Sequence, residues 1–268
     1  MHIKVLEPII LNSSALSLEV RYSEWDTKAI GHPVMEIKMI EIRDIQKSRI
    51  QLSKIIEELT LHKTALISCR IPYEFLRESM VLENVGFKFI ETILHPFTDR
   101  LYEKEFVSDK SILIEEAKEG ELVNLSKIAE ISFKSDRFTV DYRIPKNCSG
   151  IRYKNWLLSC KYYTHQKVYK FSKNKHIIGF FIVEEDFTLR NAYWNLTAIS
   201  PQYQGKGLGR KCWEAMLSYY QSLNFNEVST TISARNSPVL NLYSKLNFRF
   251  RNPEMTFHWV NNELFETR

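Results

Sequence analysis

The chain has 268 residues, of which 44% are hydrophobic and 26% charged, and its formal net charge is +5. This length fits two domains or one large one, and the composition is that of an ordinary globular protein. Because the positive charge is mild and dispersed, an anionic small molecule is a better ligand than nucleic acid. No apolar run approaches the roughly 18 residues of a membrane span and no signal-peptide pattern opens the chain, so we expect a cytoplasmic protein without a membrane partner.

The cysteines give no sign of a disulfide framework or a metal site. Cys69, Cys148, Cys160 and Cys212 are scattered, without a Cys-x-x-Cys pair or a histidine at zinc-ligand spacing. Four isolated cysteines in a chain of this length are typical of reduced thiols. We therefore expect no metal cofactor.

The first predicted elements alternate between strands and helices. Over residues 34–42 apolar side chains recur in period two, which predicts a half-buried strand. Asp44 can cap a helix that runs to about residue 62, with an apolar stripe of Ile50, Ile55, Ile56 and Leu59. A buried strand, a helix and a closing strand are then predicted over 64–69, 73–84 and 87–94. This β-α-β-α-β order favours a sheet covered by helices.

The middle of the chain predicts further elements around one irregular loop. A strand is expected over 111–116 and a helix over 121–133, where Leu122, Leu125, Ile128, Ala129 and Ser132 recur at helical spacing. Residues 134–149 break all periodicity, and a loop of this length inside a compact domain is often functional. An aromatic-rich helix, a hairpin that turns at Asn174, and one more strand follow over 150–163, 167–184 and 193–199.

The alternating order returns toward the C-terminus. Helix, strand, short helix and strand are predicted over 211–224, 227–233, 238–246 and 248–260. Residues 67–70, Ile-Ser-Cys-Arg, parallel residues 232–235, Ile-Ser-Ala-Arg, and 82–87 parallel 242–248. We interpret this as a faint internal repeat, and chance similarity of two α/β segments is the alternative. We predict an N-terminal half-repeat over 1–108 and a second domain over 109–268.

The stretch from 196 to 209 carries the strongest functional signal. A short strand runs into a turn with Gln204 and three glycines at alternate positions, and an amphipathic segment begins near Leu208. Glycines remove side chains where a ligand must touch the backbone, and a helix N-terminus offers unpaired amides and partial positive charge. The turn therefore predicts a cradle for a pyrophosphate, although it lacks the Gly-Lys-Ser/Thr ending of a P-loop. The alternative is a helix-opening turn without a ligand.

Gln204, Gly207 and Gly209 form a Gln-x-x-Gly-x-Gly pattern that resembles the acetyl-CoA signature of the GNAT N-acetyltransferase superfamily. Residues 236–248 resemble its second landmark, an Asn followed seven residues later by a Tyr and then a Gly-Phe-like end. Asn247 stands where glycine is usual, and Asn tolerates the left-handed cap that Gly would supply. The resemblance covers 111–260 and implies an α/β fold with a mixed sheet. Here it would be a GNAT fold preceded by a smaller, degenerate GNAT-like half-repeat.

The resemblance implies that acyl-CoA, either acetyl-CoA or a longer one, is the co-substrate and lies between two splayed strands, 196–199 and 230–234. Backbone amides of the first strand would bind pantetheine and polarise the thioester. The residues that the resemblance assigns to the coenzyme are Thr197, Ala198, Ile199, Gln204, Gly205, Lys206, Gly207, Leu208, Gly209 and Asn236. Asn236 is equally well explained as the N-cap of a helix with Pro238 in its first turn.

Tyr243 would be the general acid that delivers a proton to the departing sulfur. Its ordinary pKa near 10 keeps it protonated at neutral pH. The alternative is that Tyr243 only packs, on one apolar face with Val239, Leu242 and Leu246.

A general base is harder to identify in the sequence. Many relatives carry a Glu on the strand before the cradle, where this chain has Trp194 and Asn195. We interpret Glu184, Glu185 and Asp186 as a solvated acidic turn. We therefore expect a base that acts through water, or none.

A narrower resemblance concerns the acceptor. Residues 25–34, 133–138, 153–156 and 257–259 look like the nucleotide-amino-sugar N-acyltransferases that include dTDP-fucosamine acetyltransferase, which also carry an N-terminal half-repeat. This implies the amine of a dTDP-linked amino-dideoxyhexose as acceptor, in lipopolysaccharide or O-antigen biosynthesis. Such a substrate needs an aromatic platform for thymine and cations for the diphosphate. We expect these from Arg137, Phe138, Tyr142, Arg143, Tyr153 and Trp156, with core packing or surface charge as the alternative for each.

Two other functions stay open at this point. One is a GNAT enzyme that acylates a protein N-terminus, a polyamine or an antibiotic, and an acidic pocket would favour it. The other is a non-catalytic module that binds CoA. The partners that we expect are a nucleotide-linked amino sugar and, as an alternative to a monomer, a second copy of the chain in a homodimer.

Overall fold

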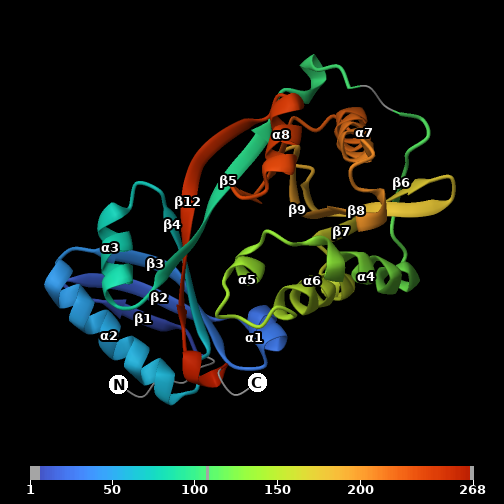
Figure 1. Ribbon diagram of the computed structural model, residues 1–268. Coiled ribbons are helices and arrows are strands. Elements are labelled where there is room, and N and C mark those ends of the chain that lie inside the picture. Colours follow the sequence, from blue (N-terminus) through green and yellow to red (C-terminus); the bar gives the residue numbers. More distant parts are fainter. Residues whose placement is uncertain (1–6, 107–108, 266–268) are drawn as a thin grey trace. The chain divides into compact units, whose positions relative to one another are not determined.

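The computed structural model describes residues 7–106 and 109–265 (Figure 1). Contacts within the chain define two compact units, each built from separate segments. Unit 1 comprises Met1–Ile93, Ser135–Ser149 and Asn252–Arg268, and unit 2 comprises Leu94–Lys134 and Gly150–Arg251. Our division of the chain into domains over 1–108 and 109–268 stays a prediction.

Unit 1 is a sheet with helices packed on it. Its strand order is β1-β2-β3-β4-β12, in which only β3 and β4 run parallel. The strands are β1 (Ile9–Asn12), β2 (Leu16–Tyr22), β3 (Val34–Ile42), β4 (Leu66–Pro72) and the last part of β12 (Arg249–Val260). The helices are α1 (Glu24–Ile30), α2 (Ile45–Leu61), α3 (Leu76–Asn84) and α5 (Arg137–Val140).

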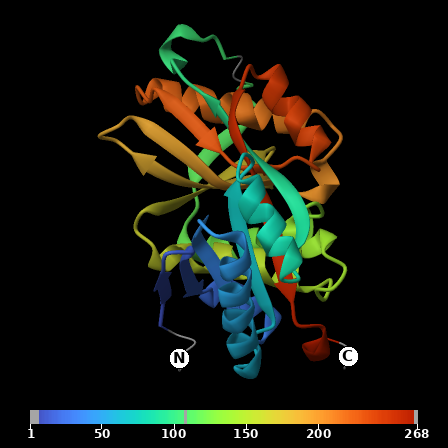
Figure 2. The same cartoon turned by 90° about the vertical axis from the view of Figure 1, so that its left-hand side faces the viewer.

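Two apolar clusters hold unit 1 together. Apolar residues of α2 and α3, such as Leu52, Leu59 and Leu82, pack with the strands into one cluster. Figure 2 shows α2 running in front of these strands. A second, smaller cluster contains Ile30 at the end of α1 and Phe138 of α5. Burial of these side chains is the main stabilising term for such a unit, at about 25 cal/mol per Å².

Unit 2 is a sheet with helices on both faces. Its strand order is β5-β10-β9-β8-β7-β6, in which only β10 and β9 run parallel. The strands are the last part of β5 (Lys88–Thr98), β6 (Leu113–Glu116), β7 (Gln166–Lys173), β8 (His176–Asp186), β9 (Asn191–Ile199), β10 (Glu227–Thr230) and the short β11 (Ile232–Ser233). α7 (Leu208–Ser222) and α8 (Ser237–Lys245) pack on one face, and α4 (Leu122–Ser132) and α6 (Cys148–Ser159) on the other.

Several local predictions are confirmed by the backbone. Asp44 caps α2, where its Oδ1 accepts the N–H of Lys47 at 3.0 Å. Asn174 and Lys175 have φ angles of 50° and 66°, which makes the turn between β7 and β8 the left-handed type that suits a two-residue hairpin.

The helices α3 and α8 end in the same way, one in each unit. Gly86 after α3 has φ 99°, and the N–H of Phe87 bonds to the carbonyl of Leu82 at 3.0 Å. Asn247 after α8 has φ 58°, and the N–H of Phe248 bonds to the carbonyl of Tyr243 at 3.0 Å. The left-handed cap that we expected at Asn247 is therefore confirmed.

Other predictions need correction. The strands β1 and β2 and the helix α1 lie before residue 34, where no element was predicted. Ile50 is 53% exposed, while Leu52 is buried, because the buried stripe of α2 follows 52, 55, 56 and 59 and Ile50 lies opposite to it. β4 begins two residues later than predicted and runs to Pro72. The segment 134–149 is less irregular than predicted, since it contains α5 and the start of α6.

Candidate functional site

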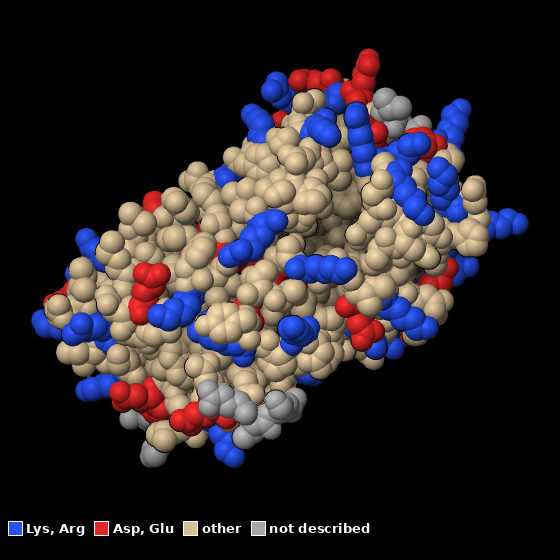
Figure 3. Space-filling view, in the orientation of Figure 1, with Lys and Arg blue, Asp and Glu red and all other residues tan. Residues whose placement is uncertain are grey.

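The two parallel strands of unit 2 part from each other halfway along β9. Their pairing begins at Glu227 with Asn191 and ends at Thr230 with Trp194, whereas β9 continues to Ile199. The hydroxyl of Thr230 donates to the carbonyl of Trp194 at 2.7 Å and closes the paired part. Beyond this point that edge of β9 has no partner strand among the described residues, and Figure 3 shows a hollow in the surface over β9. Main-chain groups of β9 are therefore left for a ligand.

A β-bulge lies at the same place on the other edge of β9. Trp194 pairs with Val183 and Leu196 pairs with Ile182, so that Asn195 is an extra residue on β9. Trp194 packs in the cluster with α7 and α8, whereas Leu196 packs in the cluster with α4 and α6. Bulges of this kind are frequent beside active sites, because they redirect side chains and end strand pairing.

The glycine turn follows directly after β9 and opens α7. Gly205 and Gly207 have φ angles of 73° and 72°, and a Cβ at either position would meet no atom within 4 Å. The N–H groups of Gly205, Lys206 and Gly207 form no hydrogen bond within the described part of the chain. Unpaired amides and open space at a helix N-terminus are what an anionic group needs.

The other residues of this turn have distinct places. The Gln204 side chain donates to the carbonyl of Ile199 at 2.8 Å, so that it ties the turn to the end of β9. Lys206 is exposed, Leu208 is buried, and a Cβ on Gly209 would lie 3.9 Å from Leu242 of α8. Asn236 caps α8 and accepts the N–H of Val239 at 3.4 Å, which is the structural role that we set beside coenzyme binding.

Tyr243 lies in α8 with its ring buried against Phe248, 4.8 Å between ring centroids. Burial raises the pKa of Tyr243 to about 12, and the nearby polar groups of Trp213, Thr230 and Thr197 partly offset this effect. Thr230 and Thr197 lie where the strands part, so the hydroxyl is next to the edge of β9 that lacks a partner.

The acidic residues at the end of β8 differ from our interpretation, which was wrong for Glu185. Its side chain is only 2% exposed, and its Oε1 accepts hydrogen bonds from Tyr169 at 2.8 Å and Tyr220 at 3.1 Å. Lys167 lies 2.8 Å from the second oxygen. Glu185 is therefore a buried structural group. Its three partners come from β7 and α7, which the sequence does not show to be neighbours.

Glu184 is the acidic group that the structure connects to the bulge. Its Oε1 accepts from the Asn195 amide at 3.0 Å and from Gln166 at 3.0 Å, and its side chain is 41% exposed. The pairing of Glu184 with the bulged residue is a feature that the sequence analysis missed, since the bulge itself gives no sequence signal here.

Four of the residues expected to bind the acceptor lie in unit 1. Arg137 pairs with Asp26 at 2.8 Å, and its guanidinium lies 4.9 Å from the ring centroid of the buried Phe138. Arg143 holds both oxygens of Asp141, at 2.9 and 2.8 Å. Tyr142 differs from these three paired or buried residues, because 94% of its surface is exposed.

The other two lie in unit 2. Tyr153 is buried, with its ring centroid 4.1 Å from that of Phe133. Trp156 donates its indole N–H to Gln166 at 3.2 Å, and the Arg152 guanidinium lies 5.6 Å from its ring. Both aromatic side chains therefore take part in the packing of unit 2, and their contact with an acceptor stays a prediction.

Asp141 also binds a buried histidine, and this pair should make the stability of unit 1 depend on pH. Asp141 Oδ2 lies 2.9 Å from His258 Nδ1. Although burial acts in the other direction, hydrogen bonds from His258 and Arg143 hold the pKa of Asp141 well below its usual range. Burial lowers the pKa of His258 to about 4, against the opposing effect of its bond to Asp141.

We therefore expect stability to fall as the pH drops from 6.5 to 4. A histidine in the unfolded chain binds its proton near pH 6.5, so the unfolded state takes up the proton first and is favoured, by about 3 kcal/mol in total. The urea midpoint should decrease over this range, and H258Q should flatten the curve. H62Q, at an exposed position, serves as the control. An unchanged slope in H258Q would contradict this assignment.

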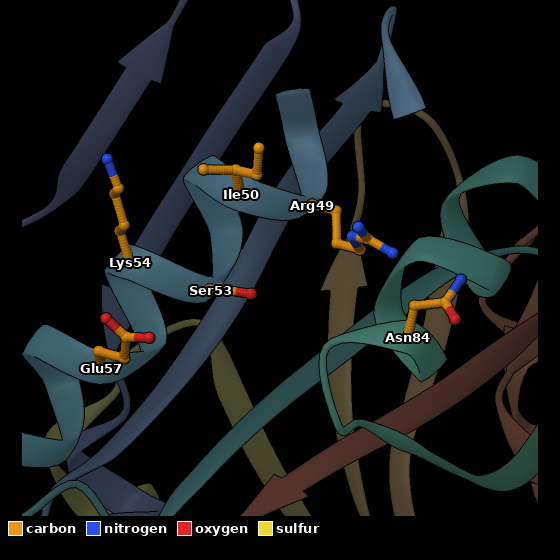
Figure 4. Close-up of a pocket in the computed structure, with 6 residues that line it drawn as sticks. All are labelled: Arg49, Ile50, Ser53, Lys54, Glu57 and Asn84. Carbon is orange, nitrogen blue, oxygen red and sulfur yellow. The ribbon is translucent and has the colours of Figure 1, made fainter. Parts of the chain in front are cut away.

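Another hollow lies on unit 1 and has a different character. Its volume is about 370 Å³, and Figure 4 shows its lining, which is formed by Arg49, Ile50, Ser53, Lys54 and Glu57 of α2 and Asn84 of α3. Arg49 points toward Asn84, whereas Lys54 points away. None of the residues that the sequence assigns to a ligand lines it.

In the described ranges, no group of three or more His, Cys, Asp or Glu side chains could hold a metal ion. The helices of the same ranges include none with the length and apolar character of a membrane span.

Comparison with known proteins finds a family model that matches part of the chain. Residues 135–248 match the family model described as acetyltransferase (GNAT) family. This match supports an acyl-CoA-dependent transferase. Among curated proteins, none matches this sequence significantly.

Solved structures match over nearly the whole chain. A GCN5-related N-acetyltransferase from Sphaerobacter thermophilus has 11% identity and a TM-score of 0.63, with 93% of this chain and 82% of that one covered. A tandem GNAT protein from the clavulanic acid biosynthesis pathway has 12% identity and a TM-score of 0.61, with 94% and 81% covered. A GCN5-related N-acetyltransferase from Kribbella flavida has 11% identity and a TM-score of 0.59, with 97% and 93% covered. The chain therefore has the mixed α/β fold of the GNAT superfamily acetyltransferases, with a half-repeat before the part that the family model matches.

Proposed function

We propose that this chain is an N-acyltransferase that moves an acyl group from acyl-CoA to the amine of a dTDP-linked amino-dideoxyhexose. The observation that carries the proposal is the parting of β9 and β10 between the glycine turn and Tyr243. This arrangement combines an anion cradle, an edge of free main-chain groups and a buried hydroxyl in one unit. These are the three parts that transfer from a coenzyme thioester needs.

The residues that would hold acyl-CoA fit its chemistry. The free N–H groups of Gly205, Lys206 and Gly207 suit the pyrophosphate, and the open space at both glycines lets it approach the backbone. Main-chain groups of Thr197, Ala198 and Ile199 suit the amides of pantetheine and the thioester carbonyl, and one such donor contributes about 3–4 kcal/mol in acyl transfer. When bound, the coenzyme supplies the activated acyl group.

The acyl group would pass directly to the amine without a cysteine intermediate. Cys212 lies in α7, in the same cluster as Tyr243, but burial raises its pKa to about 12. A thiol with this pKa is not a nucleophile at neutral pH. Correct placement of the two reactants can itself supply roughly 7–11 kcal/mol.

Tyr243 would protonate the leaving sulfur. Its pKa of about 12 keeps it protonated at neutral pH. No residue of the site is assigned as a strong base, so the amine arrives partly deprotonated or loses its proton through water. Glu184 is the carboxylate that could accept such a proton, because it is half exposed and bound to the bulged Asn195.

The identity of the acceptor rests on the sequence resemblance and on chemistry. An exposed aromatic ring such as Tyr142 suits the thymine base, and Arg137 and Arg143 are cations that suit a diphosphate. Both arginines already pair with a carboxylate, so binding would require each to share its guanidinium.

The test is a thiol-release assay with the purified full chain. Acetyl-CoA and longer acyl-CoA esters are each supplied with dTDP-amino sugars, spermidine or a peptide with a free N-terminus, and the products are identified by mass. We expect release to be fastest with a dTDP-amino sugar. Faster release with spermidine or the peptide would replace the proposed acceptor, and CoA binding without release on any amine would indicate a non-catalytic module.

We also expect each chain to bind one CoA, in unit 2. In unit 1 the parallel strands β3 and β4 stop pairing after Ile37, but the free edge of β3 is already occupied. The N–H of Ile42 donates to Glu78 at 3.1 Å, and its carbonyl accepts from Arg77 at 3.2 Å. The carboxylate of Asp44 sits at the N-terminus of α2, where it would repel a phosphate. Calorimetric titration should give one site per chain, and two sites would contradict this interpretation.

A further inference from the structure

Two tryptophans in the core of unit 2 have indole N–H groups without an acceptor. They are Trp194 of β9 and Trp213 of α7, and the Nε1 atom of each is buried and has no partner among the described residues. A buried donor without a partner costs about 1–3 kcal/mol, and buried tryptophans usually find one. Two such donors in one apolar cluster therefore require an explanation.

The two indoles share their surroundings. Phe181 contacts both, with ring centroids 4.8 Å from Trp194 and 4.6 Å from Trp213. The two indole rings lie 6.4 Å apart and at right angles, in the same cluster as Tyr243. They differ in one respect, since Trp213 is among the polar groups that act on the Tyr243 hydroxyl and Trp194 is not.

Tyr243 needs help to act as an acid. Even with the polar groups of Trp213, Thr230 and Thr197 nearby, its pKa of about 12 lies above the roughly 8.5 of an ordinary thiol. Loss of its proton to a thiolate therefore depends on groups that stabilise the phenolate. Thr230 cannot supply this stabilisation, because its hydroxyl already donates to the Trp194 carbonyl at 2.7 Å. Thr197 and Trp213 are the other polar groups near the Tyr243 hydroxyl. The N–H of Trp213 is uncommitted and can donate.

We infer that Trp213 is a positioning residue whose indole N–H donates to the Tyr243 oxygen as that hydroxyl gives up its proton. The inference rests on the proposed function. In the transfer the amine nitrogen bonds to the acyl carbon, the carbon–sulfur bond breaks with its electron pair on sulfur, and Tyr243 gives its proton to the sulfur. The Tyr243 phenolate then regains a proton, through water, from the nitrogen that became positively charged on attack. Charge on the Tyr243 oxygen exists only during this step, so the hydrogen bond from Trp213 favours the transition state.

A matched pair of variants separates this role from packing. W213F and W194F each remove one indole from the same cluster and one unpartnered N–H. In the otherwise unchanged full chain, 3-fluorotyrosine placed at position 243 gives a ¹⁹F NMR signal and a phenol acidic enough to titrate before the protein unfolds. We expect W213F to raise the pKa of this phenol by about one unit, with W194F leaving it unchanged. Equal shifts in both variants, or no shift in W213F, would overturn the inference without any assay of activity.

The activity arm uses acetyl-CoA with the acceptor that the unchanged chain acylates fastest. Loss of a hydrogen bond to the charged Tyr243 oxygen destabilises the transition state, so W213F should lower kcat about 10-fold. The KM for acetyl-CoA should stay within about 2-fold. W194F should keep kcat within about 2-fold. If W213F does not fold, benzothienylalanine at position 213 keeps the bicyclic shape and removes only the N–H. Full activity of Y243F would reject the proposed role of Tyr243 itself. A lower kcat in Y243F together with equal kcat values in W213F and W194F would reject only the role of Trp213.

Discussion

Replacing Tyr243 with phenylalanine should lower kcat about 100- to 10,000-fold, which is the contribution of a positioned acid. The affinity for CoA should change little, because the cradle at Gly205 and Gly207 lies in a different element. Stability should change little, because the ring stays packed against Phe248. Steady-state rates, calorimetric CoA binding and thermal unfolding measure these three quantities.

Tyr220 provides the opposite case and therefore the control. Its hydroxyl donates to Oε1 of the buried Glu185 at 3.1 Å, so that Y220F removes one of the two tyrosine hydrogen bonds to this oxygen. This variant should lose about 1–3 kcal/mol of stability and keep its kcat. Unchanged turnover in Y243F would remove Tyr243 from the mechanism, whatever Y220F does.

Replacing Gly207 with valine should raise the Kd for CoA at least about 100-fold, equivalent to about 2.7 kcal/mol. The Cβ of the new residue would stand in space that is open in the free protein and that the pyrophosphate would fill. The φ of 72° at this position adds backbone strain of roughly 1–2 kcal/mol for a side chain. Some loss of thermal stability is therefore expected together with the loss of binding.

A variant of Gly31 separates the loss of CoA binding from the loss of stability. It ends α1 with φ 82°, and a Cβ there also meets nothing within 4 Å, but no ligand is expected at this position. G31V should therefore lose a similar amount of stability and bind CoA normally. Equal CoA affinity in G207V and the unchanged chain would show that the turn is not the coenzyme cradle. Should G207V fail to fold, G207N tests the same space with a residue that tolerates this backbone.

The elements that the sequence predicts well have strong local signals. The alternation over 34–42, the Asp44 cap and the turn at Asn174 each depend on neighbours within a few residues, and all three are present in the structure. The sequence Leu-Ser-Leu-Glu-Val-Arg-Tyr of β2 has the same kind of alternation, so this strand could also have been predicted.

The features that the sequence analysis missed depend on distant residues. Glu185 is buried because Tyr169, Tyr220 and Lys167 surround it, and these come from β7 and α7. The bulge at Asn195 depends on register with β8, and no local residue marks it. In the sequence, Trp213 looks like an ordinary apolar residue of a helix. Only the packing of its unpartnered indole in the same cluster as Tyr243 distinguishes it.

The predicted coenzyme site is recoverable from sequence for a physical reason. A cradle for a pyrophosphate needs backbone amides and the absence of side chains, and the residue type of Gly205 and Gly207 shows both features in the sequence. The acceptor site has no residue type that marks it in this way. Arginines and aromatic residues also serve packing and ion pairs, as Arg137 and Phe138 do here, so residue type alone does not separate the two uses.

The most direct test of the whole account is a crystal structure of the chain with CoA. We expect the pyrophosphate within hydrogen-bond distance of the N–H groups of Gly205 and Gly207, and the sulfur between the parted strands beside the Tyr243 hydroxyl. Coenzyme bound elsewhere, with the glycine turn empty at saturating concentration, would contradict the account.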